Sequence, residues 1–445
     1  MKAKQSLIIG ILFLAGFDLK AETLSFSEVW QKISASSPAQ QGAKLKTESV
    51  DAGLSRAQLH WLPRIYLDAR TYRTNDPGNA FLGLLEQRKV ENADFSPDSL
   101  NHPDDQLFTR GAIGLDLALY EGGMKDAQVE MYKRLSTSEK LAATQIEIDQ
   151  YAGSGLAYGS IVSIQKQKQK LSELNNEMTK LMKGYQLGQK SNPVGYSGLL
   201  GMKSLANRIS GLIEQLEAQE KSYYAALKEM GVQDLNWSPT AIEVKNFVDQ
   251  YFAEKSENVA IQSYKSQAQL QQALANLEAS KMEKARYLPR VGAFAESSIF
   301  NGSRDTSNAY TAGLYLQWSL LDPSDFGKYK EATLGAQAAR KFTEASVQQE
   351  NAVREGLSEN DKALRSNLTR LEESDKLLSE QTKVSSQLFK NGSINALQFV
   401  EILNRRTDLI MQQSEAEIGL LKVASERIQK AKFEIPSVAI GGGQK

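Results

Sequence analysis

The chain has 445 residues, of which 53 are basic and 53 acidic, so its formal net charge is zero, and it contains no cysteine. The missing cysteines exclude disulfides, thiol catalysis, thiolate metal sites and lipidation through an N-terminal cysteine. Because opposite charges are interspersed along the chain, no basic face is expected, which argues against a protein that binds nucleic acid.

The N-terminal segment 1–21 is typical of a secretory signal peptide. Lys2 and Lys4 precede an apolar stretch over 7–17, whose ~11 residues are too few to span a bilayer. The small residue Ala21 closes a plausible cleavage site; a retained membrane anchor is the alternative. No other segment has the ~18 apolar residues of a membrane helix, so we expect an exported protein whose membrane-spanning part is a β-barrel.

The rest of the chain follows one pattern twice. A Leu-Pro-Arg junction at 62–64 and another at 288–290 each end a polar helical run and open an alternating stretch. In each half a loop, a second alternating stretch and a very long helix come next. An internal repeat means that both halves solve the same burial problem, and neither half has the elements for a globular core. The first repeat is expected over 22–231 and the second over 255–436.

Two shorter segments complete this division of the chain. An inter-repeat segment over 232–254 joins the halves and is expected to cover the middle of the helices. The tail 437–445 contains three consecutive glycines and is predicted to be disordered.

Four strands of about ten residues are predicted, and on each of them apolar residues alternate with polar or small ones. They lie over 64–73, 110–120, 290–300 and 309–320. The alternation is the pattern of transmembrane barrel strands; a soluble antiparallel sheet with one wet face is the alternative. Two isolated hairpins separated by a long helical stretch make no soluble core, which favours the barrel. Prominent polar positions on these strands are Asp68, Arg70, Asp116, Glu296 and Gln317.

Long helices are predicted for most of the remaining chain. Those over 124–183 and 325–388 have about sixty residues each, or ~90 Å at 1.5 Å per residue. In each half two shorter helices sum to roughly that length, and we expect them end to end beside the long one: 37–60 and 194–231, then 255–287 and 396–431. A stripe of apolar residues in the first long helix has coiled-coil spacing and indicates packing rather than a ligand site. Its members are Leu171, Leu174, Met178, Leu181 and Tyr185.

In these features the chain resembles the TolC-like outer-membrane efflux protein family. The resemblance rests on the doubled layout, the two Leu-Pro-Arg junctions, and the helix turns Tyr-Gln-Leu-Gly at 185–188 and Leu-Phe-Lys-Asn-Gly at 388–392. It covers essentially all of the chain after residue 21. It implies a mainly α protein with a membrane β-barrel: three copies of four strands would close a twelve-stranded barrel, and the duplicated coiled-coil helices would form an α-barrel across the periplasm.

The resemblance also implies roles for particular residues. The five polar strand positions named above would line the barrel lumen. Two hairpin tips would dock a periplasmic adaptor (membrane fusion) protein, since glycine allows close backbone approach, although glycine is also the usual helix C-cap. The docking positions are Leu187, Gly188 and Gln189 at about 184–193, and Asn391, Gly392 and Ser393 at about 389–395.

A gate at the same tips would use different side chains. The candidates are Phe389, Ile394, Gln398 and Glu401. Members of the family often place Asp, Arg and aromatic residues there, and this chain departs from that pattern. Glu401 alone could supply a threefold carboxylate ring, which would favour cations; a solvated helix glutamate is the alternative. The long loop 73–109, with its own apolar piece at 81–85, is expected to be a surface insertion, and a lid over the pore is the alternative.

The expected function is therefore passive transport, without catalytic residues, metal or cofactor. A homotrimer in the outer membrane of a Gram-negative bacterium, in contact with its lipid, would be the exit duct of a tripartite efflux pump or a type I secretion system. An inner-membrane pump or ABC exporter would supply the energy through the adaptor. The transported substrate stays open, although the lack of Met and His clusters near the tips disfavours a dedicated copper or silver channel.

Two other functional classes fit the sequence less well than a channel does. An enzyme is disfavoured because the only histidines, His60 and His102, lack ligand or triad spacing, and there is no phosphate loop, nucleophile elbow or zinc motif. A soluble periplasmic coiled-coil adaptor, or a structural protein without a pore, would have one helical hairpin rather than a doubled set interrupted by barrel-like strands.

Overall fold

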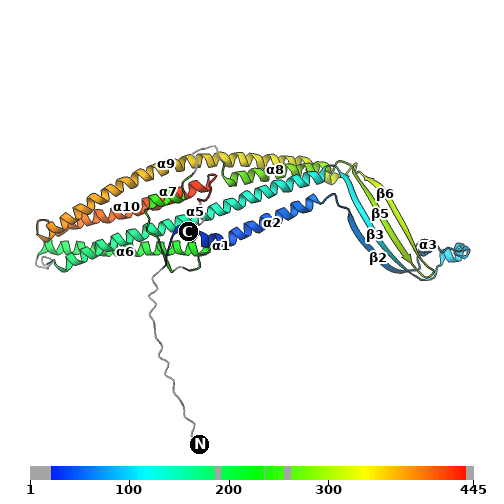
Figure 1. Cartoon of the computed structure of the whole chain (residues 1–445), viewed down its shortest axis with the longest axis horizontal. Helices are drawn as coiled ribbons and strands as arrows, with labels where there is room; N and C mark the ends of the chain where they lie inside the picture. Colours follow the sequence, from blue (N-terminus) through cyan, green and yellow to red (C-terminus); the bar gives the residue numbers. More distant parts are fainter. Residues whose placement is uncertain (1–21, 186–191, 235, 255–261, 437–445) are drawn as a thin grey trace, which may run out of the picture. The chain divides into compact units, whose positions relative to one another are not determined.

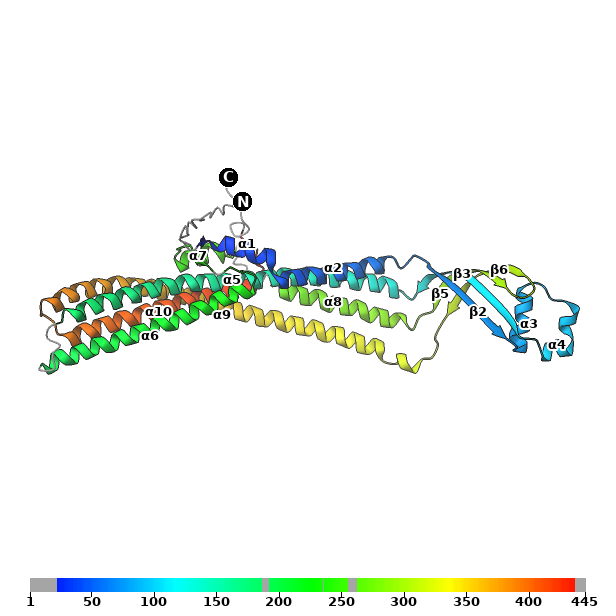
Figure 2. The same cartoon turned by 90° about the horizontal axis from the view of Figure 1, so that it is seen from below.

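A computed structural model describes residues 22–185, 192–234, 236–254 and 262–436 (Figures 1 and 2). The predicted signal peptide 1–21, the tail 437–445 and the tip residues Leu187, Gly188 and Gln189 lie outside these ranges. The chain divides into two compact units. Unit 1 holds the residues up to Pro38, 147–259 and those from Arg354 onward; unit 2 holds 39–146 and 260–353.

Unit 2 contains a four-stranded antiparallel sheet in the order β2-β3-β5-β6 (Figure 1). The strands are β2 Arg64–Thr74, β3 Gln106–Glu121, β5 Arg290–Asn301 and β6 Thr306–Gln317. Strand β3 begins before the predicted residue 110, and β6 ends before the predicted residue 320. The alternation of apolar residues continues past Gln317, but Gln317 pairs with Arg290, the first residue of β5, so no strand lies opposite the residues that follow. The indole of Trp318 instead donates to the carbonyl of Tyr287 at 3.2 Å.

The connection between β2 and β3, predicted as a loop, contains short helices. These are α3 Pro77–Glu86, the 3₁₀ turn η1 Asn92–Phe95 and α4 Pro97–Asn101. A second 3₁₀ turn, η2 Pro323–Asp325, follows β6. Asp76 caps α3, and Ser96 caps α4 by accepting from a backbone N–H of the first turn. These side chains satisfy backbone donors that a helix start leaves without partners.

The helices of unit 2 pack through small residues and paired polar groups. They are α2 Pro38–Gln58, α8 Tyr264–Ala285 and the first parts of α5 Met124–Lys183 and α9 Lys328–Lys390. Gly53 of α2 lies against the ring of Tyr132 on α5. The hydroxyls of Ser263 and Ser266 at the start of α8 donate to the buried carboxylate of Glu350 on α9. A negative charge at a helix N-terminus is favourable, because the free N–H groups there carry partial positive charge.

Unit 1 contains the later parts of α5 and α9 with α6 Pro193–Glu229 and α10 Ala396–Gln429. The predicted coiled-coil stripe lies in their core, where Leu171, Leu174 and Met178 are almost fully buried. A second core is aromatic and includes Phe26, Tyr151, Tyr158 and Phe247. It lies beside α1 Phe26–Ser36, α7 Val244–Tyr251 and a two-stranded parallel pair, β1 Glu22–Leu24 with β4 Trp237–Pro239.

Candidate functional site

The register of the sheet gathers the predicted polar positions on one face. Residues paired across antiparallel strands share a face, and successive residues along a strand alternate between faces. Tyr66 pairs with Gly114, which pairs with Glu296. By the same register the five positions proposed from the sequence all fall on this face, which we call the polar face: Asp68, Arg70, Asp116, Glu296 and Gln317.

Charged groups on the polar face have hydrogen-bonding partners, some on another strand and some on their own. Glu296 of β5 accepts hydrogen bonds from the Tyr66 hydroxyl at 3.0 Å, the Arg110 guanidinium at 2.6 Å and the Ser298 hydroxyl at 2.9 Å. The Tyr315 hydroxyl of β6 donates to Asp116 of β3 at 3.1 Å. Arg70 donates to Asp68 on the same strand at 2.9 Å. The charged groups named here therefore lie in three hydrogen-bonded groups rather than standing alone on the face.

Aromatic rings on the polar face lie directly over glycines of the neighbouring strand. An added Cβ at Gly114 would come within 2.1 Å of the Tyr66 ring, and one at Gly292 within 2.3 Å of the Tyr315 ring. Each ring thus crosses a glycine on the next strand and reaches an acid on the strand beyond. These tyrosines are not among the positions predicted from the sequence. The signal that could have found them is a lone glycine within a strand pattern, which often marks close approach by another group.

The other side of the sheet, which we call the apolar face, is exposed and strongly apolar. The side chains of Leu67 and Tyr310 are 80% and 86% exposed. Other large apolar residues exposed on this face are Ile65, Ile113, Ile299, Leu314 and Leu316. A contiguous apolar surface of this kind normally marks contact with a protein or a membrane.

In unit 1 the described hairpin tip is a glycine-capped turn between α9 and α10. Gly392 has φ +75° and its N–H bonds to the carbonyl of Phe389 at 3.1 Å, while the N–H of Ser393 bonds to that of Leu388 at 2.8 Å. This is the Schellman arrangement, in which glycine in the left-handed conformation ends a helix. The C-cap role that the sequence left open is therefore present. Asn391, Gly392 and Ser393 are also exposed, so capping leaves them accessible.

The four gate candidates have different surroundings. Phe389 is only 8% exposed and its ring lies between those of Tyr185 and Phe399, at centroid distances of 5.2 and 5.1 Å. Ile394 packs against the same helix core. In this chain both side chains therefore pack inside the tip.

The other two gate candidates are polar and already have partners. The Gln398 side chain accepts from the backbone N–H of Asn395, completing a capping box at the start of α10. Glu401 is exposed and pairs with Arg405 one turn later at 3.1 Å. An exposed pair of this type has little effect on stability, so Glu401 keeps a solvated carboxylate.

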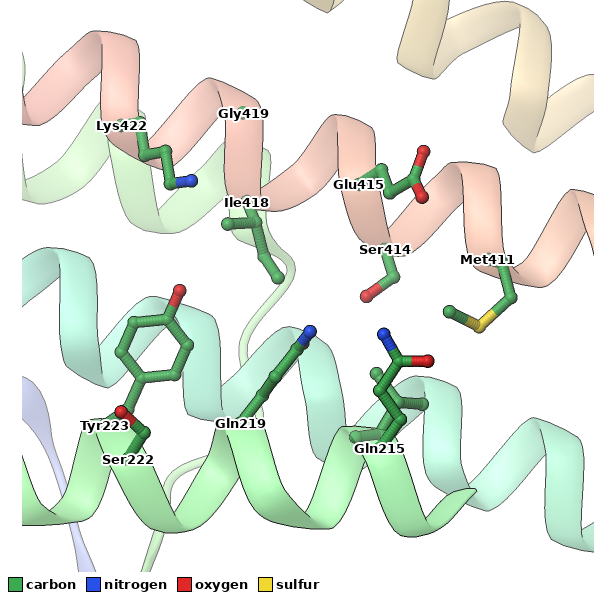
Figure 3. A pocket seen from close by; sticks show the side chains of 11 residues that line it. Gln215, Gln219, Ser222, Tyr223, Met411, Ser414, Glu415, Ile418, Gly419 and Lys422 are labelled. Atoms are coloured by element: carbon green, nitrogen blue, oxygen red, sulfur yellow. The ribbon is translucent and has the colours of Figure 1, made fainter. Parts of the chain in front are cut away.

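A groove of about 530 Å³ opens between α6 and α10 (Figure 3). The side chains of Gln215 and Gln219 extend from α6 toward α10, where Met411 and Ser414 face them. The lining carries amides, hydroxyls and a thioether, with one acid and one base, and no nucleophile-base pair. It offers hydrogen-bonding contacts and no catalytic constellation.

Within the described ranges of residues, no helix combines the length and the apolar character needed to cross a membrane. Nor do three or more His, Asp or Glu side chains of those ranges gather in a way that could hold a metal ion.

Comparison by sequence finds no matching family model and no matching curated protein. Comparison by structure finds solved outer-membrane channels. CusC, described as forming a transmembrane channel, has a TM-score of 0.76 at 10% identity, over 94% of this chain and 92% of that one. The open state of the Neisseria gonorrhoeae MtrE channel has 0.73 at 11%, over 93% and 92%. The Campylobacter jejuni CmeC channel has 0.72 at 12%, over 93% and 88%. At these identities the likeness shows a shared fold.

Proposed function

We propose that this chain, which has the fold of the TolC-like outer-membrane channels, is one subunit of a passive homotrimeric channel in the outer membrane. The observation that carries the proposal is the sheet in unit 2. One of its faces is apolar and exposed, and the other carries polar and charged side chains that hydrogen-bond to one another. A lipid-facing exterior and a water-filled interior need this division.

The edges of the sheet support a closed assembly. Strands β2 and β6 each pair on one side only among the described residues, and they have 11 and 12 residues. Tilted strands of about 9–11 residues are long enough to cross a bilayer. Three copies joined from β6 to β2 would close a barrel of about twelve strands and remove every free edge, as the membrane interior requires.

Because the proposed channel is passive, the energy for transport would come from partner proteins. We infer that an inner-membrane pump or ABC exporter acts through a periplasmic adaptor that docks at the hairpin tips, in either an efflux pump or a type I secretion system. Support comes from the exposed tip residues Asn391, Gly392 and Ser393. The tip predicted at Leu187, Gly188 and Gln189 would complete this surface. Segment 1–21 would direct export and be cleaved.

The alternative, a soluble adaptor or structural protein, would leave the apolar face of the sheet in water. A matched pair of neighbouring residues separates the two functions. Leu67 lies on the apolar face and Asp68 on the polar face, and the natural chain has no cysteine to interfere. The variants Leu67→Cys and Asp68→Cys are each labelled with an environment-sensitive fluorophore and reconstituted into phospholipid vesicles.

The channel proposal predicts a lipid-like spectrum at position 67 and a water-like spectrum at position 68. Discrete, long-lived conductance steps in planar bilayers should accompany them. Water-like spectra at both positions would refute the proposal, because the apolar face would then not meet lipid.

A further inference from the structure

The connection between β2 and β3 packs on the polar face of the sheet. Helix α3 buries Ala80, Gly83 and Leu84, residues that share one side of a helix. Gly83 lies against the ring of Phe108, close enough that an added Cβ would come within 2.3 Å. Phe108 pairs with Tyr72, which places its side chain on the polar face. Figure 2 shows α3 crossing the sheet near the end of the strands.

A buried glutamine ties the end of α3 to the turn between β5 and β6. The Gln87 amide donates to the carbonyl of Gly83 at 2.9 Å, and its oxygen accepts from the backbone N–H groups of Arg304 at 3.0 Å and Asp305 at 3.1 Å. The Ser307 hydroxyl donates to the carbonyl of Glu86. Gln87 and Arg304 are 217 positions apart in the chain, and Glu86 and Ser307 are 221 apart. These contacts therefore hold α3 in addition to its own chain connections.

Arg304 adds a second tie to the same connection. Its guanidinium holds both carboxylate oxygens of Asp94 at 2.5 Å and also donates to the carbonyl of Lys89 at 2.8 Å. Two parallel bonds between a guanidinium and a carboxylate fix distance and orientation together. The Arg304 side chain, with help from the backbone N–H of Glu91, lowers the pKa of Asp94 to about 2. The pair therefore stays ionised at any ordinary pH.

The side of α3 that faces away from these ties is apolar and exposed. Leu82 and Leu85 are 56% and 44% exposed, and they lie opposite the buried residues Ala80, Gly83 and Leu84 on the helix. Phe95 is exposed nearby in sequence, and its ring contacts that of Phe81 with centroids 5.6 Å apart. Apolar side chains thus project from a helix that is fixed over a polar surface.

We propose that α3 is a fixed constriction at the outer mouth of the channel, where Leu82 and Leu85 of three copies face one another across the pore. The inference rests on the proposed function, which makes the polar face the inner face of the barrel. A helix anchored on that face lies within the lumen, and its free side points toward the axis. The exposed leucine surface of each copy therefore faces the same surface of the two other copies. An apolar ring raises the barrier to hydrated ions, because it strips water from the pore.

Single cysteines test this placement in a chain that has none of its own. Trimers carrying Leu85→Cys are recorded in planar bilayers while a charged, membrane-impermeant methanethiosulfonate reagent is added. Asp116→Cys serves as the control for the inner face, and Ile65→Cys as the control for the lipid face. Since Leu85 is exposed, the substitution should leave the fold intact; Leu82→Cys repeats the test one turn earlier.

We expect labelling at position 85 to change the conductance in steps by roughly half or more, because charge is added where the pore is narrowest. Position 116 should change less and position 65 not at all. A response at 116 with none at 82 or 85 would overturn the constriction and leave the channel standing. Conductance that responds at 65 but not at 116 would reverse the assignment of the faces. No conductance from any folded trimer would refute the proposed function itself.

Discussion

Replacing Gly292 with alanine should destabilise the sheet, because the Tyr315 ring occupies the space that a methyl group would need. The added Cβ would meet the ring at 2.3 Å, so the ring must move and its hydroxyl must leave Asp116. Losing a hydrogen bond to a charged group costs ~1.5–3 kcal/mol, and we take the lower end because Tyr315 is half-exposed. Displacing the ring adds ~1 kcal/mol, and the better strand propensity of alanine returns ~0.5–1 kcal/mol.

The net expectation for Gly292→Ala is a loss of about 1.5–2 kcal/mol in the free energy of unfolding. Gly111→Ala is the matched control, because a Cβ at Gly111 meets nothing within 4 Å. That variant should be as stable as the natural protein or slightly more stable. The assay is denaturant unfolding of the detergent-solubilised protein, followed by near-ultraviolet circular dichroism. The double variant Gly292→Ala with Tyr315→Ala should show no penalty beyond that of Tyr315→Ala, since the clash is then absent. Equal stability of Gly292→Ala and Gly111→Ala would refute the reasoning, because it would mean that the ring moves at no cost.

Other predictions follow from the loop and the hairpin tip. Arg304→Ala should increase hydrogen exchange across residues 77–101, and unchanged protection would show that the Asp94 pair is dispensable. The pKa of Asp94 is lowered to about 2, against an unfolded value of ~3.9. The contribution of Asp94 to stability is therefore fully present above pH ~3.9 and is lost as the pH falls through about 2. Hydrogen-exchange protection of the natural protein should accordingly be constant from neutral pH down to about 4. Gly392→Val should abolish export by a cell carrying the cognate pump, while trimer formation and membrane insertion persist. Gly392→Asn is the control, because asparagine tolerates the positive φ of this position. Normal export by the valine variant would show that the tip is not part of the docking surface. Glu401→Gln should weaken cation selectivity, and identical reversal potentials would leave Glu401 as a solvated partner of Arg405.

The sequence was most informative where one physical requirement acts on every residue of an element. The period of two on the strands arises because each strand has one apolar face, and the boundaries of β2 and β5 follow the predicted ranges closely. The mainly α class with a few strands is confirmed by the structure and by the likeness to solved channels. The end of β6 was misplaced, because alternation persists after the partner strand has stopped.

Contacts between distant residues could not be predicted in the same way. The crossing of Gly114 by Tyr66 depends on the register between two strands, which no local pattern specifies. The placement of α3 depends on Gln87 and Arg304, which lie in different halves of the chain. By contrast, the capping role of Gln398 can be predicted from its spacing to Asn395, which is that of a capping box. The roles of the tip and lumen residues stay predictions.

The two tyrosine crossings run in opposite directions, and each spans three adjacent strands. One starts at β2 and ends on β5; the other starts at β6 and ends on β3. The sequence repeat relates β2 to β5 and β3 to β6, so this symmetry is not inherited from the duplication. Each edge strand is thereby braced to a strand two places inward. In the proposed ring of three copies, any error in the position of an edge strand would recur at every junction between subunits. The ring would fail to close if these errors added up. The braces make each sheet a stiff segment of defined width, so that the accuracy of the ring is set within the subunit before its neighbours arrive.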